Sequence, residues 1–387
     1  MLLSIKSQQM KRTRRHNQQR AVHYSLLSKT FIVLLLLCMC GYAQQPREFS
    51  AAQVAQIQQQ VQAVMEQEKI PALSLAIISQ RGQMSAGYGQ ADVANALAAT
   101  ASTKYRLASL SKPITAVAVM QLAEKGELDL DAPVQKYVPS FPVKPWPITS
   151  RELLGHLSGI RHYEGEGVIT NHHYDTLTDA LDVFKDAPLL SEPGTTYHYS
   201  SYGYNLLGCV VEGASGMKFE DYIRQYIFEP ANMKASGIYD PRHRPADLAR
   251  GYTVKPDGTV VRSEPGDTSY KTPSGGIYST VEDMANFAVA LQSGKLVRPE
   301  TLNQMWTRQR TRDGKYTAYG LGWDLIEYAG HLEVDHSGSQ SGTTTLLYMR
   351  PQEHLIVTLM CNMRDEPRGP YKQIHALARQ LANIATR

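Results

Sequence analysis

The stretch Tyr105-Arg-Leu-Ala-Ser-Leu-Ser-Lys-Pro-Ile-Thr-Ala-Val-Ala-Val-Met-Gln-Leu122 places three polar side chains at the start of an apolar segment: Ser109, Ser111 and Lys112. The residues from Ile114 to Met120 are almost all apolar or small, which predicts a helix buried on most sides. Pro113 is tolerated in the first turn of a helix, where N–H groups have no internal partner. Ser109 to Lys112 should therefore lie at the N-terminus of this helix.

Ser109 and Lys112 are three residues apart and should share one helix face. A buried ammonium is costly unless its pKa falls, and a lysine with a lowered pKa can take a proton from a nearby hydroxyl. The pair therefore predicts a serine nucleophile with its base beside it. The alternative is a capping serine and a surface lysine. The same spacing recurs at Ser215 and Lys218, where glycines indicate a loop and hence a chance match.

The first 43 residues differ in composition from the rest of the chain. They contain seven Lys or Arg, no acidic residue and the apolar run Phe31 to Cys40. This pattern predicts a secretory signal peptide over residues 1–43, cleaved after Ala43, with Met10 as an alternative start. Lipoprotein anchoring at Cys38 or Cys40 is disfavoured, because neither cysteine follows the usual small residue. We expect a periplasmic or extracellular protein with no stable membrane span after cleavage.

Composition predicts one globular domain over residues 44–387, because 42% of the chain is hydrophobic and 20% is charged. Seven of the 40 Lys and Arg residues precede Gln44, which leaves 33 against 36 Asp and Glu and a net charge of about −3. The basic pI of the whole chain is therefore no sign of a nucleic-acid partner. Cys209 and Cys361 have apolar neighbours, which favours two buried thiols over a disulfide.

Strand patterns lie at both ends of the chain and helix patterns lie between them. The predicted helices outside the Ser109 segment include residues 54–64, 151–157 and 371–384, and the predicted strands are 73–79, 84–88, 331–335, 343–349 and 354–363. This order predicts an α/β (α+β) fold with one sheet lobe from residues of about 50–100 and 320–387. A mostly helical lobe of about 105–315 should be inserted into it.

The segment from Ile160 to Pro193 raises the question of a metal site, because it is rich in possible ligands: His162, Glu164, Glu166, His172 and His173. No pair among them has the spacing of a zinc enzyme, and histidines in loops are mostly solvated. The sequence therefore predicts no metal and no cofactor.

Two further motifs follow the Ser109 pair in order. Tyr199 stands just before an apolar segment that predicts a helix, and His336-Ser337-Gly338-Ser339 follows a predicted strand. With Ser109-Leu-Ser-Lys112, these motifs resemble the three signatures of the penicillin-recognising serine hydrolases. That family includes class C β-lactamases, D-alanyl-D-alanine carboxypeptidases and family VIII esterases. The chain looks most similar to the branch that contains the mitochondrial β-lactamase-like serine protease.

Three other stretches are similar to the same family: Gly155 to Tyr163, Ser274 to Thr280 and Tyr319 to Trp323. The likeness covers the chain from about Ser50 to its end. It implies a β-lactamase/transpeptidase-like fold, in which an antiparallel sheet is flanked by helices. It also implies a small-molecule or peptide substrate.

The resemblance assigns a role to each matched residue. Ser109 would attack a carbonyl, Lys112 would help to deprotonate it, and Tyr199 would pass the proton to the leaving group. The backbone N–H groups of Ser109 and Ser339 would hold the oxyanion, the first helped by the helix N-terminus. On this basis we expect the substrate-binding and oxyanion residues to be Ser201, His336, Gly338 and Ser339.

Two positions depart from the family pattern. Ser201 stands where lactamases and peptidases usually carry an asparagine, and a serine cannot offer the same paired donor and acceptor. His336 replaces a lysine and offers a weaker, pH-dependent attraction for a substrate carboxylate. The sequence therefore predicts an exported serine hydrolase for ester or peptide bonds with weak β-lactam turnover. A true β-lactamase and a catalytically silent binding module on the same fold remain the alternatives.

Overall fold

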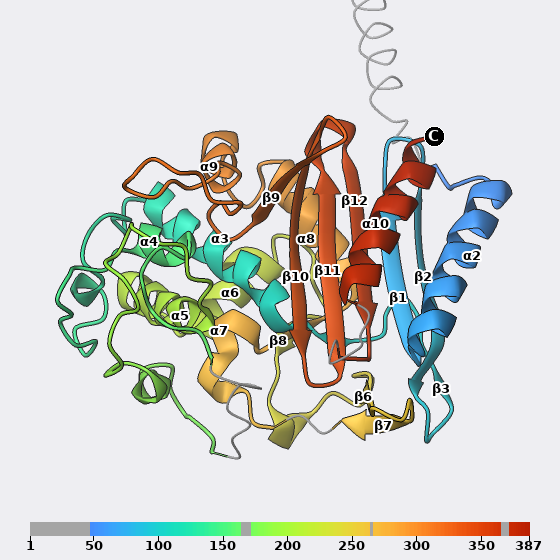
Figure 1. Cartoon of the computed structure of the whole chain (residues 1–387), viewed down its shortest axis with the longest axis horizontal. Coiled ribbons are helices and arrows are strands. Elements are labelled where there is room, and N and C mark those ends of the chain that lie inside the picture. The colour runs from blue at the N-terminus through green and yellow to red at the C-terminus, as the bar shows by residue number, and fades with distance from the viewer. Residues whose placement is uncertain (1–46, 164–171, 264–265, 365–370) are drawn as a thin grey trace, which may run out of the picture. The chain divides into compact units, whose positions relative to one another are not determined.

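The computed structural model describes residues 47–163, 172–263, 266–364 and 371–387, and residues Glu48 to Arg387 form one compact unit. The predicted signal peptide and the candidate ligands Glu164 and Glu166 lie outside the described residues. A seven-stranded antiparallel sheet forms one layer of this unit, in the order β3-β2-β1-β12-β11-β10-β9 (Figure 1). Its strands are β1 (Ala72–Ile78), β2 (Gln83–Asp92), β3 (Leu97–Ala98), β9 (Asp324–Tyr328), β10 (His331–Gln340), β11 (Thr343–Arg350) and β12 (Leu355–Cys361).

The two ends of the chain meet in the middle of this sheet. β1 pairs with β12 in antiparallel register, with Leu73 opposite Cys361 and Ile78 opposite Ile356. Both strands are buried along almost their whole length, because helices cover both faces of the sheet. The predicted sheet of N- and C-terminal segments is confirmed.

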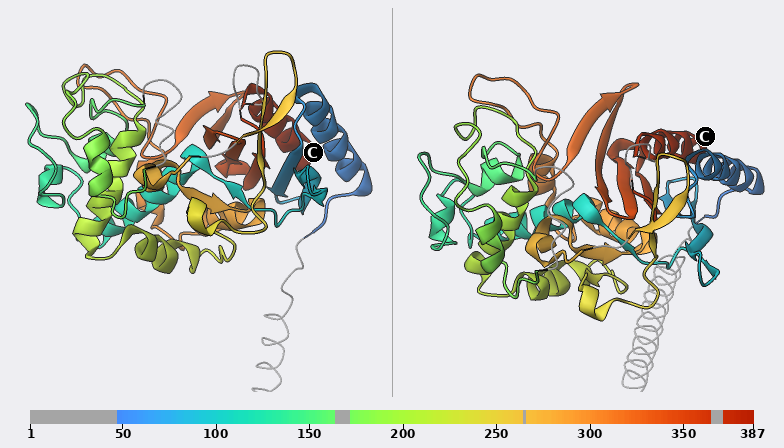
Figure 2. Two further views of the ribbon diagram at one scale, coloured as in Figure 1. Left: turned by 90° about the horizontal axis from the view of Figure 1, so that it is seen from below. Right: turned by 60° about the horizontal axis from the view of Figure 1, so that its bottom comes forward.

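Helices α2 (Ala51–Glu68) and α10 (Tyr371–Thr386) lie side by side on one face of the sheet (Figure 2). Ser50 and Gln53 form a capping box at the start of α2, and Ile57 and Val61 on one face of the helix are buried. Helix α8 (Val281–Gln292) packs against β1 and β12 from the opposite face.

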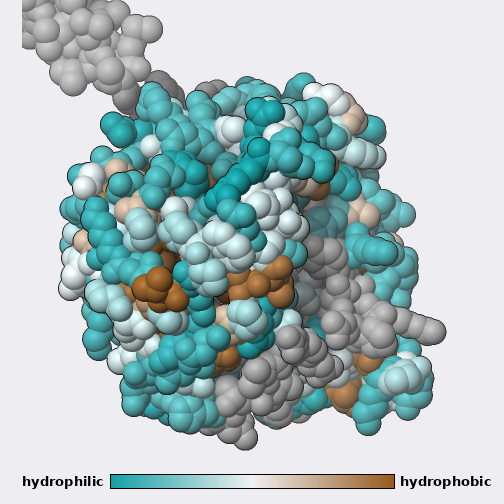
Figure 3. Space-filling view, turned by 60° about the vertical axis from the view of Figure 1, so that its left-hand side comes forward, coloured by the Kyte–Doolittle hydropathy of each residue, from teal (hydrophilic) through white to brown (hydrophobic). Residues whose placement is uncertain are grey.

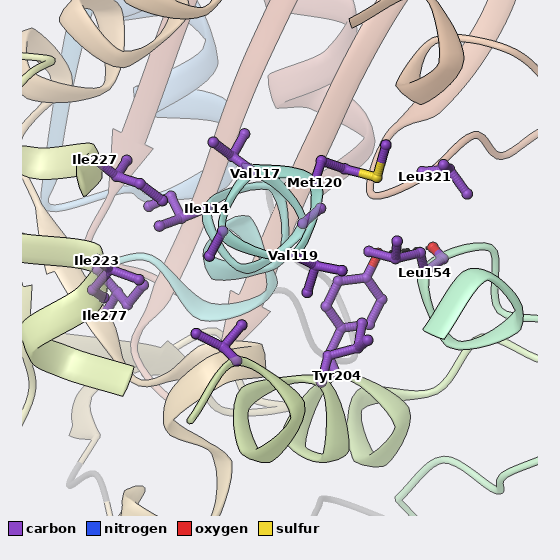
Figure 4. Packing of buried hydrophobic residues seen from close by; sticks show 14 of the residues in the cluster. Ile114, Val117, Val119, Met120, Leu154, Tyr204, Ile223, Ile227, Ile277 and Leu321 are labelled. Atoms are coloured by element: carbon purple, nitrogen blue, oxygen red, sulfur yellow. Dashed lines mark hydrogen bonds between the residues drawn. The ribbon is translucent and has the colours of Figure 1, made fainter. Parts of the chain in front are cut away.

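Helix α3 (Ser111–Glu124) lies between α5 (Ser201–Ser215) and the sheet, and every residue from Ser111 to Leu122 is buried. Figure 4 shows Val117 directed towards the strands and Val119 directed towards Tyr204 of α5. A helix that is apolar on all sides is stable only where neighbours surround it, so the prediction of a buried helix is confirmed. This packing fixes the position of the residues at its N-terminus.

The middle of the chain supplies most of the remaining elements. The short helices are α4 (Ser150–Leu154), α6 (Phe219–Ile223), α7 (Thr272–Gly275) and α9 (Pro299–Met305), with a π-helical turn η4 (Arg224–Phe228). The 3-10 turns are η1 (Ala108–Leu110), η2 (Val134–Lys136), η3 (Asp179–Val183), η5 (Pro241–His243), η6 (Ser269–Lys271) and η7 (Pro351–Glu353). Two small sheets complete the unit: β4 (Tyr105–Arg106) with β8 (Ile277–Ser279) and β5 (Gly237–Ile238), and β6 (Gly251–Val254) with β7 (Val260–Ser263).

The structure differs from the sequence-based expectation in several places. Strands β3 and β9 and the two small sheets were not predicted, and the helix predicted over 151–157 ends at Leu154. β10 continues to Gln340, beyond the predicted strand 331–335. The residues from His336 to Gln340 are polar or small, so their sequence lacks the apolar alternation of a strand. Pairing with β11 keeps them extended.

Cys209 and Cys361 are buried free thiols, as expected. The face viewed over the helical part is mostly hydrophilic, with small separate apolar patches (Figure 3). Among the residues that the structure describes, no helix is long and apolar enough to cross a membrane.

Candidate active site

Ser109 lies in the 3-10 turn η1, directly before α3, and its side chain is partly exposed. The preceding residue, Ala108, has a φ of 50°, a conformation that non-glycine residues rarely adopt. The amine Nζ of Lys112 lies 2.9 Å from Ser109 Oγ. The structure thus brings the predicted nucleophile and the predicted base into hydrogen-bond contact.

Lys112 is fully buried. Its Nζ donates to the carbonyl oxygen of Ser274 at 3.1 Å and lies 4.9 Å from the ring centroid of Tyr199. Burial lowers the pKa of Lys112 well below 10.5, and the positive charge of Lys271 lowers it further, while the Asp324 carboxyl opposes the shift. A neutral amine in this position can accept the hydroxyl proton of a serine.

Tyr199 precedes α5 and is partly buried. Burial raises its pKa well above 10, and a hydrogen bond with Ser109 offsets part of the shift. Its phenol is therefore neutral near pH 7 and able to donate a proton. Ser109, Lys112 and Tyr199 form one cluster, although they come from segments far apart in the sequence.

His336 is buried on β10, and protein groups satisfy both of its ring nitrogens. Nδ1 lies 2.7 Å from the carbonyl oxygen of Ser337, which only accepts, so Nδ1 carries the proton. Nε2 then accepts from the hydroxyl of Tyr319 at 3.0 Å. Burial and the nearby Lys112 lower the pKa of His336 to about 3. The pH-dependent attraction for a substrate carboxylate that the sequence predicted for His336 does not fit this arrangement.

Gly338 lets β10 approach the turn that carries Ser109. A β-carbon at Gly338 would lie 2.2 Å from the Leu107 carbonyl oxygen and 2.9 Å from the Leu110 nitrogen. β9 pairs with β10 up to Asp335, so the following stretch of β10 packs against η1. Ser339 is the next residue and its side chain is exposed. The predicted oxyanion residues, Ser109 and Ser339, therefore lie on two elements in contact.

Ser201 begins α5 and is 1% exposed. Its backbone N–H donates to Nδ1 of His162 at 3.1 Å, and its side chain forms a hydrogen bond with Tyr163. The predicted role of Ser201 as a substrate contact therefore does not fit its side chain, which is used within the protein. Burial, together with Lys112 and Lys271, lowers the pKa of His162 to about 4, so this acceptor stays neutral.

His156 belongs to a stretch that resembles the family, but the sequence assigned it no role. Its ring is buried and lies 4.3 Å from the ring of Tyr199 and 4.6 Å from that of Tyr319, measured between centroids. Its Nδ1 accepts the Ser200 backbone N–H at 3.0 Å. His156 lies two residues after the end of α4 and has a φ of 58°. His156 therefore positions Tyr199 by packing and by holding the start of α5.

The histidine-rich segment is described only in part, because Glu164 and Glu166 lie outside the described residues. His173 is paired through Nδ1 with Asp267 Oδ2 at 2.8 Å. Over the described ranges, no group of three or more His, Cys, Asp or Glu side chains could hold a metal ion.

Comparisons with known proteins agree with this geometry. The sequence model of the Beta-lactamase family matches residues 57–381. The human mitochondrial serine beta-lactamase-like protein LACTB is 28% identical, over 73% of this chain and 71% of the relative. The putative penicillin-binding protein PbpX of Bacillus subtilis is 32% identical, over 70% and 68%. The octameric penicillin-binding protein homologue from Pyrococcus abyssi superposes with a TM-score of 0.73 at 28% identity, over 85% and 77%.

The family match spans most of the chain and includes every residue of the cluster around Ser109. The described unit has the sheet of N- and C-terminal strands and the helical insertion expected for that fold. The chain therefore belongs to the Beta-lactamase family and is a serine hydrolase of the β-lactamase and penicillin-binding-protein type.

Proposed function

We propose that this protein is an exported hydrolase that forms an acyl-enzyme at Ser109 and acts on ester or peptide bonds, with weak turnover of β-lactams. The observation that carries the proposal is the 2.9 Å contact between Ser109 Oγ and the amine of the fully buried Lys112. The second Ser-x-x-Lys pair offers no such contact, because Ser215 Oγ donates to the Val211 carbonyl oxygen and Lys218 is exposed.

In the acylation step, neutral Lys112 takes the proton of Ser109 as Oγ bonds to the substrate carbonyl carbon. The negative charge on the carbonyl oxygen is held by the backbone N–H groups of Ser109 and Ser339. When the intermediate collapses, the bond to the leaving group breaks, and Tyr199 gives its proton to that group. Tyr199 regains a proton from the Lys112 ammonium.

In the deacylation step, a water attacks the acyl carbon of the ester on Ser109 and gives a proton to neutral Lys112. As the bond to Oγ breaks, Tyr199 gives its proton to Oγ and regains one from the Lys112 ammonium. The acid is released and the hydroxyl of Ser109 is restored. A neutral base and a protonated acid are needed at the start of the cycle, and burial favours both states: it lowers the pKa of Lys112 and raises that of Tyr199.

Weak lactam turnover is supported by the two departures from the family pattern. Ser201 is buried in a hydrogen bond with Tyr163, and His336 is neutral and bonded to Tyr319. The asparagine amide and the lysine cation that lactamases usually present to the substrate at the positions of Ser201 and His336 are therefore absent. Loss of one charge-assisted contact corresponds to roughly a ten- to hundred-fold loss in kcat/KM when it acts in the transition state.

The test is the steady-state hydrolysis of 4-nitrophenyl butyrate by two matched serine variants. Ser109→Ala should lower kcat by several orders of magnitude, because a nucleophile and its base act as a unit. Ser215→Ala should retain wild-type activity. Activity that survives Ser109→Ala and is lost in Ser215→Ala would reverse the assignment, and an inactive wild type against esters, peptides and lactams would favour the silent binding module.

A further inference from the structure

Lys271, the last residue of η6, is a second lysine beside the cluster around Ser109. Its Nζ lies 5.7 Å from the ring centroid of Tyr163 and 5.5 Å from that of Tyr270. The hydroxyl of Tyr163 lies 3.3 Å from Ser274 Oγ, and the carbonyl of Ser274 is the acceptor for Lys112. One tyrosine and one serine thus connect the two lysines.

The stem of Lys271 passes close to the turn that carries the nucleophile. A β-carbon at Gly275 would lie 3.7 Å from Lys271 Cδ and 3.7 Å from the carbonyl carbon of Ala108, the residue before Ser109. The Gln340 amide, at the end of β10, donates to the Gly275 carbonyl oxygen at 3.3 Å. Lys271 therefore lies close to both elements that carry the proposed oxyanion groups.

Two described neighbours of Lys271 carry positive charges. Burial lowers its pKa to about 7, and the nearby guanidinium groups of Arg106 and Arg364 add to the shift. Arg106 is itself held in place, because it lies 5.4 Å from the Tyr239 ring centroid and donates to the Ser341 carbonyl oxygen. In the part of the chain that the structure describes, no carboxylate forms an ion pair with Lys271. A partly buried ammonium without a counter-charge is costly, and an anion bound beside it removes that cost.

We propose that Lys271 binds a carboxylate of the substrate, so that the site favours acyl substrates with a negative charge. The inference rests on the Ser109 acyl-enzyme proposed above. It places the cation for the substrate on η6 and not on β10, where neutral His336 is bonded to Tyr319. The aromatic rings of Tyr163 and Tyr270 lie beside the Lys271 ammonium, and the bound carboxylate would supply a counter-charge that no described residue provides.

The test compares two esters of equal chain length, the 4-nitrophenyl monoester of glutaric acid and neutral 4-nitrophenyl valerate. The measured quantity is the ratio of their kcat/KM values. Lys271→Met should lower this ratio by about ten- to hundred-fold, the size of one lost charge-assisted contact. Lys271→Arg keeps the charge and should retain most of the preference.

Lys125→Met is the matched control. Its ammonium also lies over two tyrosine rings, 5.4 Å from Tyr222 and 4.1 Å from Tyr226, but at the far end of α3 from Ser109. The ratio should stay at the wild-type value in this variant. An equal fall in Lys125→Met and Lys271→Met would assign the effect to net charge and overturn the inference, as would an unchanged ratio in Lys271→Met.

A measurement on the wild type covers the case in which Lys271→Met does not fold. Raising NaCl from about 0.05 to about 0.5 M should lower the ratio several-fold, because salt screens the attraction between the substrate carboxylate and a partly exposed ammonium. A ratio that is independent of salt would contradict the inference. Loss of both ester activities in Ser109→Ala, with a ratio insensitive to Lys271, would refute this inference alone. Full activity of Ser109→Ala would refute the proposed function instead.

Discussion

Lys112 combines two properties that a lysine in water does not have. It has no exposed surface, and its pKa is lowered well below 10.5, chiefly by burial. Burying an amine lowers the free energy of unfolding, and the apolar packing of α3 on all sides offsets this cost. A local property of one residue therefore depends on the whole helix behind it.

We predict that Lys112→Arg is nearly as inactive as Lys112→Ala, with a loss of several orders of magnitude in kcat/KM for 4-nitrophenyl butyrate. A guanidinium stays protonated at any pH at which the protein is folded, so it cannot accept the Ser109 proton. Lys125→Arg, at the exposed end of α3, should behave as the wild type. Near-normal activity in Lys112→Arg would show that this residue is not the base.

Asp324 should make stability depend on pH. Burial, with the facing carboxyl of Asp335, raises the pKa of Asp324 from 3.8 to about 7. The folded protein thus holds a proton that the unfolded chain releases near pH 3.8. The stability that this group contributes is therefore full below pH 3.8 and is lost as pH rises through about 7.

Asp324→Asn has no carboxyl to ionise at this position, so it does not lose this stability as pH rises. The melting temperature of the variant minus that of wild type should therefore be larger at about pH 8 than at about pH 5. Asp313→Asn is the control, since Lys315 and Thr311 lower the pKa of this exposed carboxyl to about 2, outside the tested interval. Thermal unfolding at both pH values measures the difference. A gap between Asp324→Asn and wild type that stays constant would mean that Asp324 is ionised in the fold throughout.

Among the secondary-structure elements, the contact between β10 and η1 shapes the site. Gly338→Ala would place a β-carbon 2.2 Å from the Leu107 carbonyl oxygen, so strand and turn must separate. We expect a lower melting temperature and a large loss of kcat. Gly275→Ala is the matched control, because its nearest atoms lie 3.7 Å away, an ordinary contact distance. Equal effects of the two substitutions would contradict the importance of this close approach.

The elements that the sequence predicted are those whose signals are local. α2, α3 and α4 have capping residues or a continuous apolar pattern, and Thr149 and Glu152 form a capping box at the start of α4. The extension of β10 beyond Asp335 had no such signal, because pairing with β11 keeps His336 to Gln340 extended. Short strands such as β4 and β9 likewise depend on partners far away in the chain.

Within the site, too, the residues that stand in local motifs were predicted, and those whose role depends on distant contacts were not. Ser109, Lys112 and Tyr199 stand in recognisable motifs, and the structure brings them together. The packing of His156 on Tyr199 could not be predicted, because it joins residues 43 positions apart through a residue with positive φ. Lys271 was missed for a similar reason: its environment comes from Tyr163 and from the arginines of other segments.

At the scale of the whole molecule, the site lies where the helical part meets β10, so its substrate preference depends on both parts. We predict a higher kcat/KM for 4-nitrophenyl butyrate than for nitrocefin, because His336 and Ser201 are used within the protein. Steady-state assays on the two substrates measure this. A kcat/KM for nitrocefin well above that for the ester would establish the β-lactamase alternative.

The basic N-terminal segment predicts export and removal of residues 1–43. Expression of the full chain in a bacterial host should therefore give a mature protein that begins near Gln44. N-terminal sequencing of the exported material measures this directly. A protein that begins at Met1 or Met10 would contradict the prediction.

Covalent labelling of Ser109 is the central claim, and mapping the acyl-enzyme tests it most directly. The purified protein is mixed with an agent that modifies the nucleophile covalently, either a penicillin, which acylates it, or a fluorophosphonate, which phosphonylates it. The adduct is followed by intact mass and peptide mapping. The account predicts one adduct per chain, on the peptide that contains Ser109, and none in Ser109→Ala. An adduct at Ser215 or another residue, or one that forms equally in Ser109→Ala, would contradict it.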